Sequence, residues 1–130
     1  MENIYGIAGI AHIGLPTNNI TKTIEFYKNL GFEVVMETYN QKAGEKVAFL
    51  QIKNYCIECY ENGQAAMQDG AYQHVALDVE NIEEMYQRIC ENQYEVITDG
   101  VEELPFWENG VKFFMIKGPN QERIEFCQKL

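Results

Sequence analysis

The chain has 130 residues, of which 46% are hydrophobic, and it carries 20 acidic against 10 basic side chains. This length and apolar content are enough for a single globular domain over residues 1–130. The formal net charge of −10 repels nucleic acid and anionic membranes, so we expect neither as a partner. No apolar run reaches the ~18 residues of a membrane span, and the first residues lack the layout of a signal peptide, which predicts a cytoplasmic protein.

Hydrophobic periodicity predicts a strand, a helix and three more strands in the first half of the chain. Ala8 to Leu15 is the first strand, and Pro16 is expected to end it. Asn18-Asn19 supplies cap residues for a helix with one apolar face, and Gly31 stops that helix. The three strands that follow are expected at residues 32–37, 46–52 and 55–60.

The second half of the chain repeats this order of elements. Its expected strands are 72–79, 94–98, 111–117 and 123–128, and its helix is 82–90. The offset between the halves is 74 − 12 = 62 at the two histidines, and it grows to 64 where 47–50 meets 111–114 and to 67 at the last strands. A repeat of about 60 residues is too long for a solenoid unit and indicates two half-domains of one fold.

We therefore predict an α+β fold built from two βαβββ modules, at about residues 8–61 and 70–128. The two modules are expected to form a curved eight-stranded mixed sheet, with the helices on its outer face. Its other face would be the concave wall of a cleft.

Four side chains at matching positions of the repeat are candidate metal ligands. The only two histidines are His12 and His74, and each half ends in a strand with a glutamate after an isoleucine, at Glu58 and Glu125. Alternation along the strands places these residues on the face that the helices do not cover. Two imidazoles and two carboxylates suit a first-row divalent ion, so we predict a metal site formed by all four.

The four cysteines are expected to be free thiols, because their density is low and no secretory signal is present. Cys56 and Cys59 have C-x-x-C spacing, which in isolation suggests zinc or redox chemistry. On a strand, however, positions three apart face opposite ways. We therefore predict a structural role for this pair.

The sequence resembles the vicinal oxygen chelate superfamily over nearly its whole length. The resemblance rests on several stretches of the sequence. They are His12-Ile13-Gly14-Leu15, the helix region Ile24-Glu25-Phe26-Tyr27-Lys28-Asn29-Leu30-Gly31-Phe32, Gln73-His74-Val75-Ala76-Leu77-Asp78-Val79, Gly118-Pro119-Asn120, and the two Ile-Glu strands. The order His, Glu, His, Glu is similar to that of glyoxalase I, or lactoylglutathione lyase.

This resemblance implies that Ni²⁺, Co²⁺, Mn²⁺ or Zn²⁺ is bound by His12, Glu58, His74 and Glu125. It implies a lyase or isomerase that moves a proton through a metal-bound enediolate of a hemithioacetal or related α-hydroxycarbonyl substrate. Glu125 is the expected main base, and Glu58 is the second catalytic carboxylate. Glyoxalase I has an arginine four residues after its first histidine ligand that helps to hold glutathione, whereas this chain has Pro16, so the sequence leaves open whether glutathione or another thiol is used.

Two other functions stay open for this fold. One is a non-catalytic drug-binding or small-molecule-binding protein of the bleomycin resistance kind, which needs no metal ligands and is disfavoured by the four present here. The other is a thiol transferase or dioxygenase-type metalloenzyme. Fosfomycin-type transferases use three ligands, so the fourth ligand counts against them.

The segment from Asp99 to Gly110 is a candidate cover for a substrate, because it is long and contains Phe106 and Trp107. An equally good interpretation is that Trp107 anchors the loop. Arg123 shares a face with Glu125 and is a candidate partner for a substrate carboxylate, with an ion pair to an acidic residue as the alternative. We expect a homodimer whose half-domains pair within or between chains, acting on a small molecule that is possibly a thiol adduct.

Overall fold

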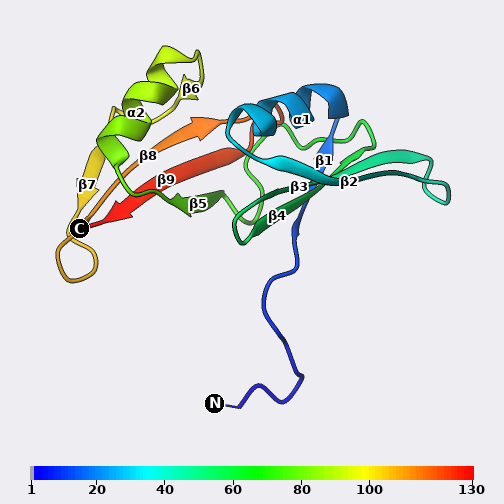
Figure 1. Cartoon of the computed structure of the whole chain (residues 1–130), viewed down its shortest axis with the longest axis horizontal. Coiled ribbons are helices and arrows are strands. Elements are labelled where there is room, and N and C mark those ends of the chain that lie inside the picture. Colours follow the sequence, from blue (N-terminus) through cyan, green and yellow to red (C-terminus); the bar gives the residue numbers. More distant parts are fainter. Residues whose placement is uncertain (1) are drawn as a thin grey trace. The chain divides into compact units, whose positions relative to one another are not determined.

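The structure, a computed structural model, describes residues 2–130. The elements are β1 (Ile13–Thr17), α1 (Ile20–Asn29), β2 (Glu33–Asn40), β3 (Glu45–Ile52), β4 (Tyr55–Glu61), β5 (His74–Asp78), α2 (Ile82–Glu91), β6 (Glu95–Val96), β7 (Glu102–Leu104), β8 (Val111–Lys117) and β9 (Arg123–Lys129). They fall into two compact units, the first ending at Ala65 and the second beginning at Ala66. Each unit has one helix and its own sheet (Figure 1), which confirms the α+β class and the division into two repeated modules. The sheets have four and five strands, so the second module has one strand more after its helix than the three expected.

In the first unit the strands lie in the order β1-β4-β3-β2, so β1 and β2 are the edges of the sheet. β1 runs parallel to β4, and the other pairs are antiparallel. The helix α1 contacts β2, β3 and β4 on one face. The buried apolar residues of this unit are Ile20, Tyr27, Phe32, Val47, Ala48, Leu50, Ile57 and Cys59.

The second unit repeats this design, with the order β5-β9-β8-β6 and with β7 also paired to β8. The parallel pair is β5 with β9, and α2 contacts β8 and β9. Phe114 is fully buried at the centre of this unit. Its ring lies 5.1 Å from that of Tyr86 on α2 and 5.2 Å from that of Phe126 on β9, measured between centroids. No helix in residues 2–130 combines the length and apolarity that a membrane crossing requires.

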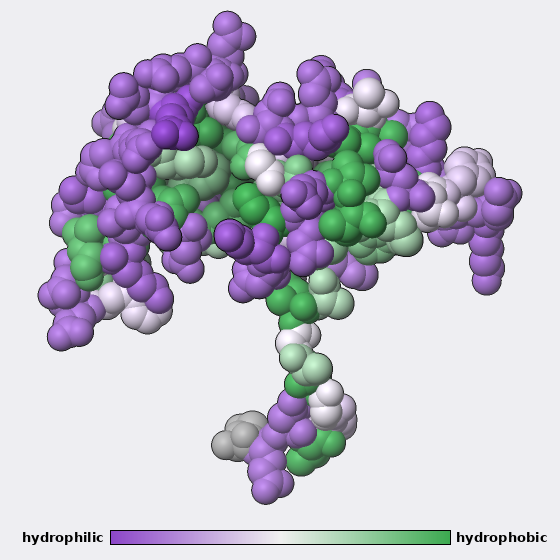
Figure 2. Space-filling view, in the orientation of Figure 1, coloured by the Kyte–Doolittle hydropathy of each residue, from purple (hydrophilic) through white to green (hydrophobic). Residues whose placement is uncertain are grey.

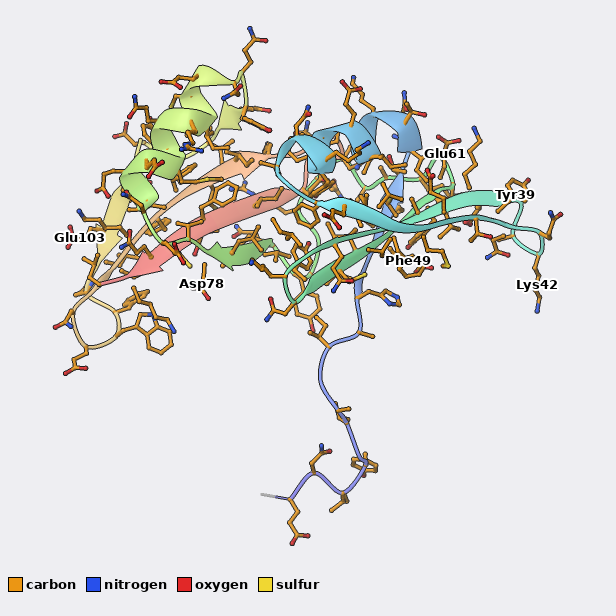
Figure 3. The ribbon with its side chains drawn as sticks, viewed as in Figure 1. Tyr39, Lys42, Phe49, Glu61, Asp78 and Glu103 are labelled. Carbon is orange, nitrogen blue, oxygen red and sulfur yellow. The ribbon has the colours of Figure 1, made fainter. Side chains whose placement is uncertain are left out.

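Both helices begin at an asparagine cap, as the sequence predicts for Asn19. The Asn19 Oδ1 accepts a hydrogen bond of 3.1 Å from the Lys22 N–H, and Asn81 does the same for Glu84. The first N–H of each helix is also bonded by the end of a neighbouring strand. Ile20 donates to the Glu61 carboxylate (Figure 3), and Ile82 donates to the Gln128 side chain.

Replacing Asn19 or Asn81 by Ala is expected to lower the free energy of unfolding by about 1 kcal/mol, because one helix N–H loses its acceptor. Urea unfolding followed by circular dichroism measures this change. Asn29→Ala, at the exposed end of α1, is the matched control and should change stability by less than about 0.5 kcal/mol. Equal losses at all three positions would show that the caps contribute nothing of their own.

Several predicted boundaries are wrong. The first strand is expected to begin at Ala8, but β1 begins at Ile13, because residues 8–12 have no strand partner. β5 begins at His74 and not at 72, and β6 covers only Glu95–Val96 of the expected 94–98.

β1 continues through Pro16 to Thr17. An edge strand tolerates proline because its outer side has no neighbouring strand that needs a backbone N–H from it. The stretch predicted as a long loop between Asp99 and Gly110 contains β7, whose Glu102–Leu104 pairs with β8. The connection to β8 is therefore a hairpin, with Phe106 and Trp107 in its turn.

The strand pairing also corrects the repeat alignment in the middle of the modules. Leu50 pairs with Ile57, and Ile116 pairs with Ile124. β3 and β8 therefore correspond at an offset of 116 − 50 = 66, not 64. Most of the extra length of the second module thus lies before β8, where β7 is, and only one residue is added in the turn after it.

Candidate metal centre

The first pair of candidate ligands lies on the face of the first sheet that α1 leaves open. His12 directly precedes β1, and β1 runs parallel to β4, which carries Glu58. The His12 Nε2 and the Glu58 Oε1 are 3.4 Å apart. The exposed fractions of the two side chains are 39% and 32%, so a dissolved ion can reach both.

The second pair has the same geometry in the second sheet. His74 begins β5, which runs parallel to β9, and the His74 Nε2 is 3.6 Å from the Glu125 Oε1. In each sheet the glutamate pairs with the residue two positions after the histidine, Gly14 opposite Glu58 and Ala76 opposite Glu125. Residues two apart on a strand share a face, so the repeated fold brings each imidazole to its carboxylate.

The donor atoms and their spacing fit a first-row divalent ion. Both separations exceed the ~2.7–3.2 Å of an N–H···O hydrogen bond. Two ligands held by one ion at about 2.0–2.2 Å lie roughly 3.0–3.5 Å apart at tetrahedral or octahedral angles, which is close to both pairs. Within residues 2–130 no three or more His, Cys, Asp or Glu side chains form a group that could hold a metal ion. The site of all four ligands therefore stays a prediction.

The strand next to each glutamate supplies an apolar neighbour that sequence reasoning missed. Phe49 on β3 pairs with Glu58, and its ring meets that of His12 edge-on at a centroid distance of 5.4 Å. Figure 3 shows Phe49 on the side of the sheet opposite α1. Met115 on β8 has the same place beside Glu125. Alternation puts both on the open face, but only the register shows that they flank the carboxylates.

The two histidine rings are supported differently. The His12 ring packs against Phe49. The His74 ring is bonded instead through its Nδ1 to the Gln73 side-chain oxygen, at 2.9 Å. Gln73 precedes His74 directly in the chain, and no pattern in the sequence distinguishes it from an ordinary exposed glutamine.

The predicted substrate residues are placed within the second unit as follows. Arg123 forms a 2.7 Å ion pair with Asp69, so its guanidinium already has a carboxylate partner. Phe106 and Trp107 are exposed by 54% and 68% in the turn between β7 and β8. The Lys129 ammonium lies 4.0 Å from the centre of the Trp107 ring, a cation–π contact that anchors the turn to the end of β9. Lys129 is four residues beyond Glu125, roughly 13 Å along the strand.

All four cysteines are free, as predicted. The two side chains of the C-x-x-C pair lie on opposite faces of β4, where Cys59 is fully buried and Cys56 is half-buried. Burial raises the pKa of the Cys59 thiol to about 11. The pKa of Cys127, on the same face as Glu125, is also raised to about 11, by burial and by the carboxylates of Glu125 and Asp78. Neither group is a ready thiolate at neutral pH, which argues against a thiol nucleophile here.

Thiol labelling is expected to separate these cysteines by accessibility. At pH 8 in native buffer, Cys90 is exposed and should react first with iodoacetamide, while Cys59 should react at least about 100-fold more slowly. Peptide mass spectrometry at timed intervals measures the order, and labelling in 6 M guanidinium is the control in which all four react alike. Early labelling of Cys59 in native buffer would contradict its burial.

Comparison with known proteins agrees with this geometry. Residues 9–126 match the family model described as the glyoxalase/bleomycin resistance protein/dioxygenase superfamily. The chain belongs to this superfamily. In Bacillus subtilis (strain 168) the protein YwbC, described as uncharacterized, is 28% identical over 127 residues, which are 92% of this chain and 97% of YwbC.

Two solved structures have the same fold. The glyoxalase family protein from Enterococcus faecalis superposes with a TM-score of 0.77 at 24% identity, covering 92% of this chain and 97% of that one. The fosfomycin resistance protein FosX from Listeria monocytogenes, in complex with Mn(II) and sulfate, has a TM-score of 0.70 at 18% identity, covering 95% and 94%. Members of the superfamily thus include a protein that binds a divalent metal ion.

Proposed function

We propose that this protein is a metal-dependent lyase or isomerase of the glyoxalase I type. Its substrate would be a hemithioacetal or a related α-hydroxycarbonyl compound, in which a proton moves between adjacent carbons. The observation that carries the proposal is that both modules keep a His–Glu pair at the spacing of two ligands of one ion, 3.4 and 3.6 Å. A drug-binding protein of this fold would have no use for such a duplicated donor set.

The metal ion would be held by His12, Glu58, His74 and Glu125, and the donor set suits Ni²⁺, Co²⁺, Mn²⁺ or Zn²⁺. When bound, such an ion supplies Lewis-acid stabilisation of negative charge on two neighbouring substrate oxygens. Glu125 accepts the proton from one carbon and returns it to the next, and Glu58 is the second carboxylate able to do so. Phe49 and Met115, the cross-strand neighbours of these carboxylates, would form apolar walls of the site.

The complete site is proposed to form in a homodimer, with one pair from each of two copies. β1 and β5 are edge strands that each carry or follow a ligand histidine, and each has only one paired side in the part of the chain described. Pairing along these edges would bring imidazoles of two copies onto one ion. Phe106, Trp107 and, after release from Asp69, Arg123 are the proposed contacts to the remainder of the substrate.

A second function is favoured by the likeness to FosX. In that case the same residues would hold a metal ion for a thiol transferase acting on fosfomycin. Three ligands suffice for this chemistry, so one of the four would be dispensable. The retention of a matched pair in each module supports the first function.

The test begins with protein stripped by a chelator and reloaded with each of the four metals. Turnover of methylglyoxal with glutathione, cysteine or another low-molecular-weight thiol is compared with turnover of fosfomycin and the same thiols. Metal-dependent isomerisation by the wild type, absent in the His12→Ala/His74→Ala variant, would support the proposal. Fosfomycin turnover alone would favour the second function, and a protein that binds none of these metals in calorimetry would overturn both.

A further inference from the structure

The segment before β1, residues 2–11, is an apolar arm that the rest of the first unit does not cover. All ten of its residues are exposed, and its large side chains Ile4, Tyr5, Ile7 and Ile10 are exposed by 73%, 85%, 68% and 72%. Figure 2 shows hydrophobic surface along this arm, which Figure 1 draws in dark blue ahead of β1. A row of four such side chains is more than the scattered apolar exposure of an ordinary surface.

The arm has a defined local shape. The Asn3 side chain bonds both the N–H and the carbonyl of Ile7, and the Gly6 N–H donates to the Asn3 carbonyl. Gly6 and Gly9 have φ angles of +71° and +136°, which favour glycine, and the space at both is open. This closed turn presents Ile4 and Tyr5 at its tip and reduces the entropy that docking would cost.

The arm also begins the longest uncharged stretch of the chain. No Asp, Glu, Lys or Arg occurs from Asn3 to Thr21, although 23% of all residues are charged. Two copies with a net charge of −10 each repel one another, and the repulsion is weakest where the contact surface carries no carboxylates. From Asn3 onward the arm meets this condition, since Glu2 is its only charged residue, and the absence of basic residues in it disfavours an anionic membrane as its partner.

We propose that the arm docks on a second copy of this chain and clamps the dimer. This inference rests on the proposed function, which puts the contact between the two copies at the edge strand β1. The arm runs directly into His12 and β1, so it would lie next to that contact. Each arm would then cover apolar surface of the partner beside the shared metal centre. The arm contributes binding energy for the dimer and no metal ligand.

The first test compares dimer dissociation constants by sedimentation in EDTA, so that no metal ion holds the copies together. In Ile7→Asp/Ile10→Asp the dissociation constant should rise by about 100-fold or more, because two side chains that docking buries become charged. Val35→Asp/Tyr39→Asp, which changes two other exposed apolar residues of the same unit, is the matched control and should leave it unchanged. Equal constants for the wild type and the arm variant, or a wild type that is monomeric at about 100 μM, would overturn the inference.

The second test identifies what the arm touches. A photoreactive benzoyl-phenylalanine at position 5 should give a product at twice the 15.0 kDa chain mass, and the same probe at Lys22, exposed on α1, should not. A cross-link only within one chain would overturn the inference. Metal titration of the wild type tests the proposed function separately, since a metal-free protein could still dimerise through its arms, and a metal-binding dimer could assemble without them.

Discussion

Glu125→Gln is expected to lower metal-dependent turnover by about 10²–10⁴-fold, because the amide cannot accept the proton that a general base removes. The amide oxygen can still reach an ion, so most of the metal affinity should remain. Turnover of the preferred hemithioacetal, measured with metal content on the same sample, separates the two effects. Glu58→Gln should reduce turnover less, because Glu58 is the second carboxylate.

Glu95→Gln is the matched control for this substitution, since Glu95 is an exposed glutamate of β6, in the same unit. It should leave both turnover and metal content as in the wild type. Equal turnover by Glu125→Gln and the wild type would remove Glu125 from the proton transfer. Loss of metal together with turnover would make Glu125 mainly a ligand.

Phe114→Ala is expected to destabilise the second unit by about 3–5 kcal/mol, because it leaves a cavity between Tyr86 and Phe126 in a fully buried position. A loss of this size is a large part of the stability of an ordinary domain. Urea unfolding measured by circular dichroism and by hydrogen exchange of β8 and β9 reports it. The exchange data assign the loss to this unit.

Phe113→Ala is the matched control, because the neighbouring phenylalanine faces the open side of the same strand and is only half-buried. The same truncation there should cost less than half as much. Similar losses at both positions would mean that the open face is packed as tightly as the helix-covered one. Such a result would leave no room for a substrate on that face.

Much of the fold was predictable because the repeat constrains it twice. Alternation in β9 separates Ile124 and Phe126, which are buried, from Glu125, which is not. The cap at Asn19 and the stop at Gly31 are local signals that tertiary structure did not override. The pairing of each histidine with its glutamate also follows, since a parallel pair of strands in each repeat places them on one face.

The remainder depends on contacts that no single strand encodes. The sequence alignment of residues 47–50 with 111–114 equates Phe49 with Phe113, but Met115 is the residue that lies opposite Glu125. The register of a hairpin is set by its turn, and the two modules have turns of different length. The short strand β7 escaped prediction since three residues carry too little periodicity to detect. Asp69 precedes its partner Arg123 by 54 residues and lies outside any element, so only the folded chain shows this ion pair.

The bond between Gln73 and His74 favours one tautomer of that ring. With the amide oxygen of Gln73 as acceptor, the N–H of a neutral imidazole lies on Nδ1, which leaves Nε2, 3.6 Å from the Glu125 carboxylate, able to bind an ion. The phenyl edge that holds His12 imposes no such choice of tautomer. In the second module, His74 is thus already in the tautomer that binds a metal ion through Nε2, whereas His12 in the first module is not held in one tautomer. Hydrogen-bond partners that orient a histidine ligand strengthen metal binding. An incoming cation is expected to engage His74 before His12, and nitrogen-15 chemical shifts of the two rings would show that order.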